Sequence, residues 1–126
     1  MANVYTNYKA KLSTNELTTV YTVPAETTAI VKSIRVSNDD VENDCNVSLY
    51  LVDSNSVSYS LEMDRTIQAK RSQELLATGN MAQDTSDSAV SAPATLVAKE
   101  SEIIKAQAQN GNDLSIIISV LEMSST

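Results

Sequence analysis

A strict alternation of apolar and polar residues, repeated along the chain, constrains the fold more than any other feature of this sequence. The clearest cases are segments 45–51 and 114–120, whose alternate positions hold Cys45, Val47, Leu49 and Leu51 and then Leu114, Ile116, Ile118 and Val120. Successive side chains of a β-strand point to opposite faces, so a period of two residues predicts strands with one buried face.

Other segments share this period or are rich in the β-branched residues typical of strands. They are residues 4–12, 17–23, 29–38, 57–63 and 101–109. We expect segment 57–63 to place its four apolar residues on one face, namely Val57, Tyr59, Leu61 and Met63. Segment 66–78 is less regular, because Ile67 and Ala69 favour a strand whereas its long polar residues also tolerate a helix; we predict a strand.

Turn-forming residues between these segments predict hairpins. Asp53–Ser56 and Ser13–Glu16 each join two predicted strands. Asn110 and Gly111 readily supply the positive φ angles of a tight turn, so we predict that the last two strands pair with each other. Pro24 has no amide hydrogen to donate to a ladder, which ends the preceding strand near Val23.

These segments predict an all-β fold. At 126 residues and 13.6 kDa, the chain has the size of a single domain spanning residues 1–126. We expect one antiparallel β-sandwich of about seven to nine strands, either jelly-roll-like or immunoglobulin-like. The expected aliphatic core consists of Val20, Ile30, Ile34, Leu49, Leu51, Leu61, Ile104, Ile116 and Ile118.

A shift in composition marks residues 78–93, which are polar, poor in large apolar side chains and closed by Pro93. We interpret this stretch as a long exposed loop that contacts another subunit, because ordering so many polar residues requires contacts outside the domain. The alternative is a tolerated surface insertion. The candidate intersubunit contact residues are Met81, Asp84, Asp87 and Val90.

The charge balance argues against nucleic acid as a partner. The chain has 16 Asp and Glu against 9 Lys and Arg, for a formal charge of -7, whereas a surface that follows phosphates needs clustered cations. The early strands hold four cations, Lys9, Lys11, Lys32 and Arg35, while every charged residue in 38–64 is acidic. We favour solvated faces of opposite sign; the alternative is self-complementary association between subunits.

No catalytic, cofactor or metal motif is present. The chain has no histidine, two glycines and one cysteine, so nucleophile–base pairs, zinc sites and phosphate loops lack their usual residues. We therefore predict a protein that is not an enzyme, and a buried Cys45. The acids at 39–44 lack the glycine and glutamate of an EF-hand loop, and we interpret them as a solvated turn. Neither a signal peptide nor an apolar run of about 20 residues is evident, so we expect no membrane segment.

Three segments together resemble a known family. They are residues 12–38, 47–53 and 94–122, within which the shared pattern is Tyr-Thr-Val-Pro-Ala at 21–25, Ala-Ile-Val-Lys-Ser-Ile at 29–34 and Leu-Glu at 121–122. The pattern resembles small virion structural proteins of tailed bacteriophages, particularly phages of marine bacteria and cyanobacteria. Those relatives turn with Ala-Gly-Asp where this chain has residues 99–101, and residues 78–93 look like an insertion.

This resemblance implies a compact β-sandwich in a phage particle and carries over no functional residue, since its motifs belong to the framework. We expect a capsid decoration or cement protein on the outside of the head, where an acidic chain is not repelled by packaged DNA. The alternative is a neck, tail or fibre-associated adaptor that contacts the host surface. Expected partners are the major capsid protein or neck and tail subunits, together with further copies of the chain, a trimer being favoured by analogy with other capsid decoration proteins.

Overall fold

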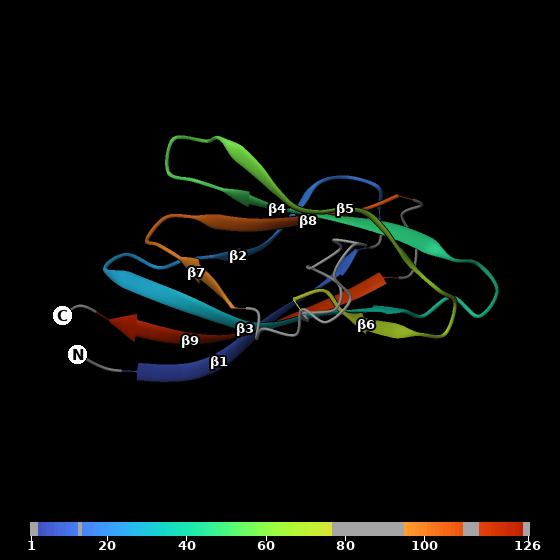
Figure 1. Cartoon of the computed structure of the whole chain (residues 1–126), viewed down its shortest axis with the longest axis horizontal. Helices are drawn as coiled ribbons and strands as arrows, with labels where there is room; N and C mark the ends of the chain where they lie inside the picture. Colours follow the sequence, from blue (N-terminus) through green and yellow to red (C-terminus); the bar gives the residue numbers. More distant parts are fainter. Residues whose placement is uncertain (1–2, 13, 77–94, 110–113, 125–126) are drawn as a thin grey trace, which may run out of the picture.

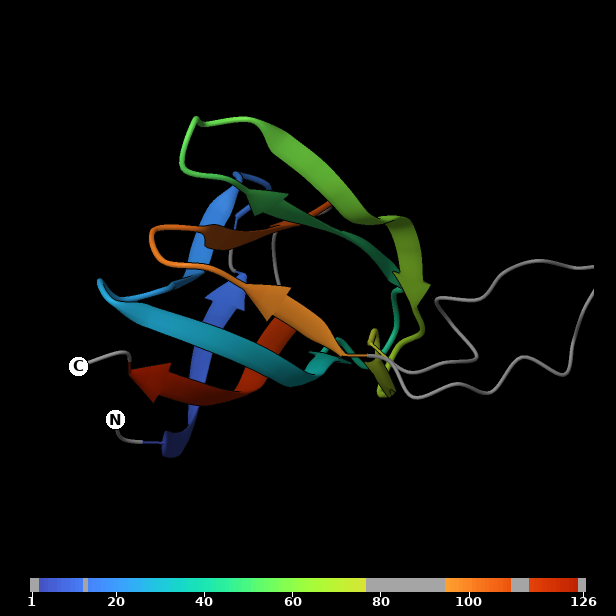
Figure 2. The same ribbon diagram turned by 60° about the vertical axis from the view of Figure 1, so that its left-hand side comes forward.

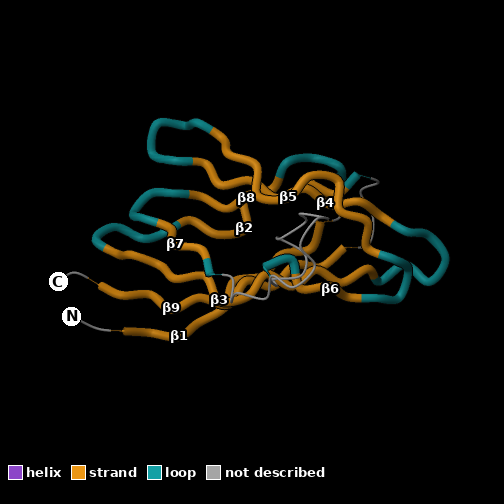
Figure 3. Tube along the Cα trace, in the orientation of Figure 1, coloured by secondary structure: helices purple, strands orange, loops and turns teal. Residues whose placement is uncertain are grey.

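The computed structural model describes residues 3–12, 14–76, 95–109 and 114–124, and within them it contains nine strands and no helix (Figure 1, Figure 3). The strands are β1 (Asn3–Leu12), β2 (Thr18–Thr22), β3 (Thr27–Asn38), β4 (Cys45–Val52), β5 (Ser58–Ile67), β6 (Ser72–Glu74), β7 (Leu96–Ala98), β8 (Ile103–Ala108) and β9 (Leu114–Ser124). The predicted all-β fold is confirmed. None of the described segments is a helix long and apolar enough to cross a membrane.

The strands form two antiparallel sheets that face each other (Figure 2). Sheet A has the order β1-β9-β3-β6, with β7 also paired to β3, and sheet B has the order β2-β8-β4-β5. The pairs are nested, because β1 pairs with β9, β2 with β8, β3 with β6 and β7, and β4 with β5. Nested pairing rolled into two sheets is the jelly-roll arrangement, which selects one of the two expected sandwich types.

Two of the three predicted hairpins are wrong, because the strands that they connect do not pair with each other. The strands on either side of Asn110 and Gly111 lie in opposite sheets, and residues 110–113 themselves are outside the described residues. The strands joined by 13–17 also lie in opposite sheets. A tight turn reverses the chain, but the buried face of each strand selects the sheet that it joins. The hairpin at Asp53–Ser56 is confirmed, and there the Asp53 carboxylate accepts the backbone N–H of Val57 at 3.0 Å.

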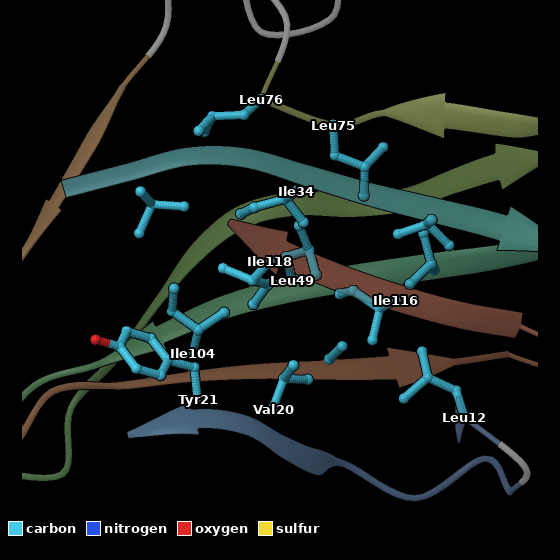
Figure 4. Close-up of a cluster of buried hydrophobic side chains, with 14 of the residues drawn as sticks. Leu12, Val20, Tyr21, Ile34, Leu49, Leu75, Leu76, Ile104, Ile116 and Ile118 are labelled. Carbon is cyan, nitrogen blue, oxygen red and sulfur yellow. The ribbon is translucent and has the colours of Figure 1, made fainter. Parts of the chain in front are cut away.

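The hydrophobic core fills the space between the inner faces of the two sheets, as the close-up in Figure 4 shows. The predicted core residues that are buried are Val20, Ile34, Leu49, Ile104, Ile116 and Ile118. Leu51 and Leu61 are partly buried and pack against this cluster. Cys45 is buried, as expected. Removing such side chains from water contributes about 1.5 to 3 kcal/mol each, which makes this cluster the main source of stability.

A β-bulge at Lys32 explains why Ile30 is not in the core. Val31 and Ser33 pair with consecutive residues of β9, so Lys32 is an extra residue in β3. An extra residue reverses the alternation of the strand. The buried apolar positions of β3 are therefore Ala29 and Val31 before the bulge and Ile34 and Val36 after it. Ile30 lies on the outer face, and its expected burial is wrong.

The prediction for segment 57–63 is also wrong. Val57, Tyr59 and Met63 are 46%, 53% and 54% exposed. β5 is the outermost strand of sheet B, and its register against β4 shifts twice, so no single face is kept along its length. The strand predicted over 66–78 is two elements, because β5 ends at Ile67 and β6 begins at Ser72 in the opposite sheet.

The Glu74 side chain closes a gap along β3. β7 pairs with β3 at residues 29–31 and β6 pairs with it at residues 35–37. Between them, Glu74 Oε2 accepts the backbone N–H of Ile34 at 2.6 Å, and Leu75 donates its N–H to the Ile34 carbonyl at 2.7 Å. The Glu74 carboxylate thus takes the place of a strand partner, and it satisfies the backbone N–H of Ile34 at this part of the sheet edge.

We predict that Leu49→Ala lowers the free energy of unfolding by about 2 to 5 kcal/mol, because Leu49 is 1% exposed at the centre of the core. Leu17→Ala is the matched control, since Leu17 is 45% exposed, and it should change stability by less than about 0.5 kcal/mol. Urea denaturation followed by circular dichroism measures both. Equal effects of the two variants would contradict the placement of Leu49.

Candidate interaction surface

An apolar row crosses the solvent side of sheet A, which we call the outer face of sheet A. The strand register aligns four residues from β1, β9, β3 and β7, namely Tyr5, Leu121, Ile30 and Val97. Opposed residues of antiparallel strands point to the same face, so these side chains are neighbours. Tyr5 is 76% exposed and Val97 is 53% exposed. A contiguous apolar surface of this kind is typical of a contact site.

Positive charge borders the apolar row. The register aligns Lys9, Ile117 and Arg35, with Lys11 further along β1. The three cations are exposed. Lys11 forms an ion pair with Asp39 at 3.4 Å, but the side chains are 77% and 52% exposed, so water screens the pair and it contributes little stability. The outer face of sheet A therefore presents cations on a chain whose net charge is -7.

Two open hollows lie on the same face. One has a volume of about 460 Å³ and is lined by residues that include Lys9, Lys11 and Ile117. The other has a volume of about 370 Å³, with Tyr5 and Lys32 among its lining residues. Hollows that combine an apolar floor with lysine ammonium groups suit a partner surface with apolar side chains and acidic neighbours.

A cluster of two tyrosines and a glutamate joins the two sheets at one end of the sandwich. Glu122 Oε2, on β9, accepts hydrogen bonds from the hydroxyl of Tyr8 on β1 at 2.8 Å and from the hydroxyl of Tyr21 on β2 at 2.7 Å. The two tyrosine rings are tilted with centroids 4.4 Å apart. Tyr21 belongs to sheet B and the other two residues to sheet A, so the cluster ties the sheets together.

Burial and hydrogen bonding shift the ionisation of both tyrosines. Burial of the ring raises the pKa of Tyr21, and its hydrogen bond to Glu122 and the charge of that carboxylate raise it further. The pKa of Tyr8 is raised by the same causes in the same order. Each phenolate would lie beside a carboxylate in a partly dry site, so both hydroxyls stay protonated and act as hydrogen-bond donors.

A polar groove runs along β5 and β6. Its volume is about 520 Å³, and its lining includes Glu62, Arg65 and Arg71. Within the described part of the chain, Glu62 Oε1 is the buried side-chain oxygen that has no hydrogen-bond partner. The groove brings both signs of charge together, but the outer face of sheet A combines charge with exposed apolar area and is the stronger candidate for a contact with another protein.

The contact residues predicted from sequence, Met81, Asp84, Asp87 and Val90, lie outside the described residues. The acids at 39–44 form a turn in which Asp40 Oδ1 accepts the N–H of Glu42 at 2.8 Å and that of Asn43 at 3.2 Å. These hydrogen bonds lower the pKa of Asp40. In the part of the chain that the structure describes, no three His, Cys, Asp or Glu residues group so as to hold a metal ion.

The tyrosine–glutamate cluster was not predicted from the sequence. Glu122 follows Val120 at the next inner-face position of β9, and a carboxylate at that position needs buried donors. This alternation was the signal that could have revealed the cluster. The Tyr-Thr-Val-Pro-Ala segment at 21–25 and the Leu-Glu segment at 121–122 meet here through the Tyr21–Glu122 hydrogen bond.

Comparison with known proteins gives a match at the level of structure. No family model matches the chain, and no curated protein matches it. One similar solved structure comes from work reporting that Bacillus endospore appendages form a novel family of disulfide-linked pili. The TM-score is 0.53 at 6% sequence identity, over 99% of this chain and 88% of the other. The likeness shows the fold alone.

The tyrosine–glutamate cluster predicts a loss of stability in alkali. The pKa values of Tyr8 and Tyr21 are raised above the ordinary 10.0, so above that pH the unfolded chain releases protons that the folded chain retains. Below about pH 10 these two groups therefore cause no pH dependence in the free energy of unfolding, and above that pH the free energy falls as the pH rises. Urea denaturation at a series of pH values measures this slope.

Tyr21→Phe removes one of the two groups and should flatten the alkaline slope. Tyr59→Phe is the control, because Tyr59 is 53% exposed and lies outside the cluster, and it should keep the slope of the parent protein. An unchanged slope in Tyr21→Phe would show that the cluster does not govern stability in alkali.

Proposed function

We propose that this chain is a non-enzymatic structural subunit of an assembled particle, the virion of a tailed bacteriophage. The observation that carries the proposal is the outer face of sheet A, where exposed Tyr5, Val97 and Ile117 lie among Lys9 and Arg35 on paired strands. A sheet holds such a surface rigidly, so little conformational entropy is lost when a partner binds.

The favoured position is the outside of the head, as a decoration or cement protein. Support comes from the phage-like pattern in the sequence and from the net charge of -7, which disfavours contact with packaged DNA. The basic outer face of sheet A would then contact acidic groups of the capsid shell, and the acidic remainder would face solvent.

A neck, tail or fibre subunit is the second candidate. It is favoured by the likeness in fold to a protein of the Bacillus endospore appendages, described as disulfide-linked pili, since tails and fibres are also linear assemblies. Both positions use the same surface, and they differ in the partner and in the number of copies. Purified particles decide between them, because head decoration requires hundreds of copies per particle whereas neck and tail positions require few.

The proposed contact predicts a charge effect on incorporation. Lys9→Glu reverses one exposed cation of the outer face of sheet A and should reduce the number of copies per particle at least several-fold. Lys99→Glu is the matched control, since Lys99 is exposed in the β7–β8 turn, and it should be incorporated normally. Quantitative mass spectrometry of particles gives both numbers. Normal incorporation of the Lys9 variant would contradict the proposed contact.

The assembly proposed here is non-covalent. Cys45 is the single cysteine of the chain and is 4% exposed, so a disulfide between subunits would require the core to open. We predict that a thiol reagent modifies Cys45 in urea and leaves the native protein unmodified over the same period. Mass spectrometry of the labelled protein tests this. Rapid modification of the native protein would place Cys45 at the surface and would contradict a purely non-covalent assembly.

A further inference from the structure

The edges of the two sheets differ in their ability to accept another strand. β2 has five residues and a register shift, and β5 has two register shifts. Opposite β9, the edge of β3 is covered by β6 and β7, which have three residues each, and by Glu74. Short and bulged edges resist further pairing.

The edge formed by β1 has none of these protections. β1 pairs with β9 over ten residues without a register shift, and no described strand pairs with its other side. Figure 1 shows it at the lower margin of sheet A. Val4 is 50% exposed and Tyr5 is 76% exposed. A long regular edge with unpaired backbone groups is a template for another strand.

We propose that β1 pairs antiparallel with β1 of a second copy, about a two-fold axis at Asn7, so that the two copies share one continuous sheet A. The interaction is isologous, because the same edge serves both copies, and it therefore forms a dimer in place of the trimer expected by analogy. The β1–β1 pairing would be one contact within the proposed assembly, but it is tested on purified protein. A negative result would therefore leave the particle experiments unaffected.

The sequence of β1 fits this register. A two-fold axis at Asn7 places Tyr5 opposite Lys9 of the second copy and Asn3 opposite Lys11, so that no two like charges are opposed. An ammonium group beside an aromatic ring is favourable, and opposed side chains of antiparallel strands are in contact. An axis at Lys9 would instead place two lysines against each other. The lysines therefore disfavour registers centred on residues 9 to 11 and permit this one.

This register also keeps the inner and outer faces of sheet A continuous from one copy to the other. The axis places Val4 opposite Ala10 and Thr6 opposite Tyr8, all of which lie on the side of β1 that faces sheet B. The outer residues Tyr5, Asn7 and Lys9 pair only among themselves. Pairing that keeps inner with inner and outer with outer extends the sandwich without exposing its core. The apolar rows of both copies then lie on one surface.

Cysteine cross-linking tests the register. In a Cys45→Ala background, Asn7→Cys should form a dimer through a disulfide under mild oxidation, because opposed residues lie within about 4.5 to 5.5 Å between Cα atoms. Tyr5→Cys alone should stay uncross-linked, since two copies of residue 5 would lie about 14 Å apart along the strand. A mixture of Tyr5→Cys and Lys9→Cys should cross-link as a heterodimer. Circular dichroism checks that each variant is folded.

Charge substitution tests the energy of the contact. Tyr5→Lys places two lysines opposite each other and should raise the dimer dissociation constant about tenfold or more. Val57→Lys is the control, because Val57 is 46% exposed but lies in the β4–β5 turn of sheet B, and it should dimerise like the parent. Adding Lys9→Glu to Tyr5→Lys should restore dimerisation by opposing unlike charges. Analytical ultracentrifugation over micromolar concentrations measures all three.

Concentration-dependent dimers with the cross-linking pattern above support the pairing. A monomer at every concentration, a trimer, or cross-linking of Tyr5→Cys alone in preference to Asn7→Cys would overturn it.

Discussion

Sheet A, and with it one wall of the core, depends on the pairing of β9 with β1 on one side and β3 on the other. β9 is eleven residues long and lies in the middle of sheet A, so the last described strand holds the first one in place. Its inner positions Leu114, Ile116, Ile118 and Val120 are at most 1% exposed. Because these contacts join distant parts of the chain, the fold forms only when most of the sequence is present, and we expect slow folding.

The same pairing sets the two surfaces of sheet A. Alternation along β9 sends Ile116 and Ile118 into the core and Ile117 outwards, and the register with β1 and β3 then aligns the outer residues into rows. Glu122 continues the inner face to the end of the strand, where two tyrosines satisfy it. The core and the candidate interaction surface therefore lie on opposite faces of sheet A, and the same backbone pairing sets both.

The period of two residues was sufficient to predict the fold class, and most of the residues that it placed in the core are buried, because burial of one face dominates strand sequences. It failed where pairing depends on distant partners. The bulge at Lys32 moved Ile30 outwards, and the turn predicted at Asn110 and Gly111 suggested a local pair where the strands join opposite sheets. The candidate interaction surface could not be seen in the sequence, since Tyr5, Leu121 and Val97 are brought into one row only by the register.

The central claim is that this sandwich acts through sheet A and its free edge, with copies meeting along β1. Amide hydrogen exchange, measured on the full chain at low and high protein concentration, tests it most directly. The account predicts that exchange in β1 slows as concentration rises, while β2 and β5, the edges of sheet B, exchange at constant rates. Exchange in β1 that does not depend on concentration, or slowing confined to sheet B, would contradict it.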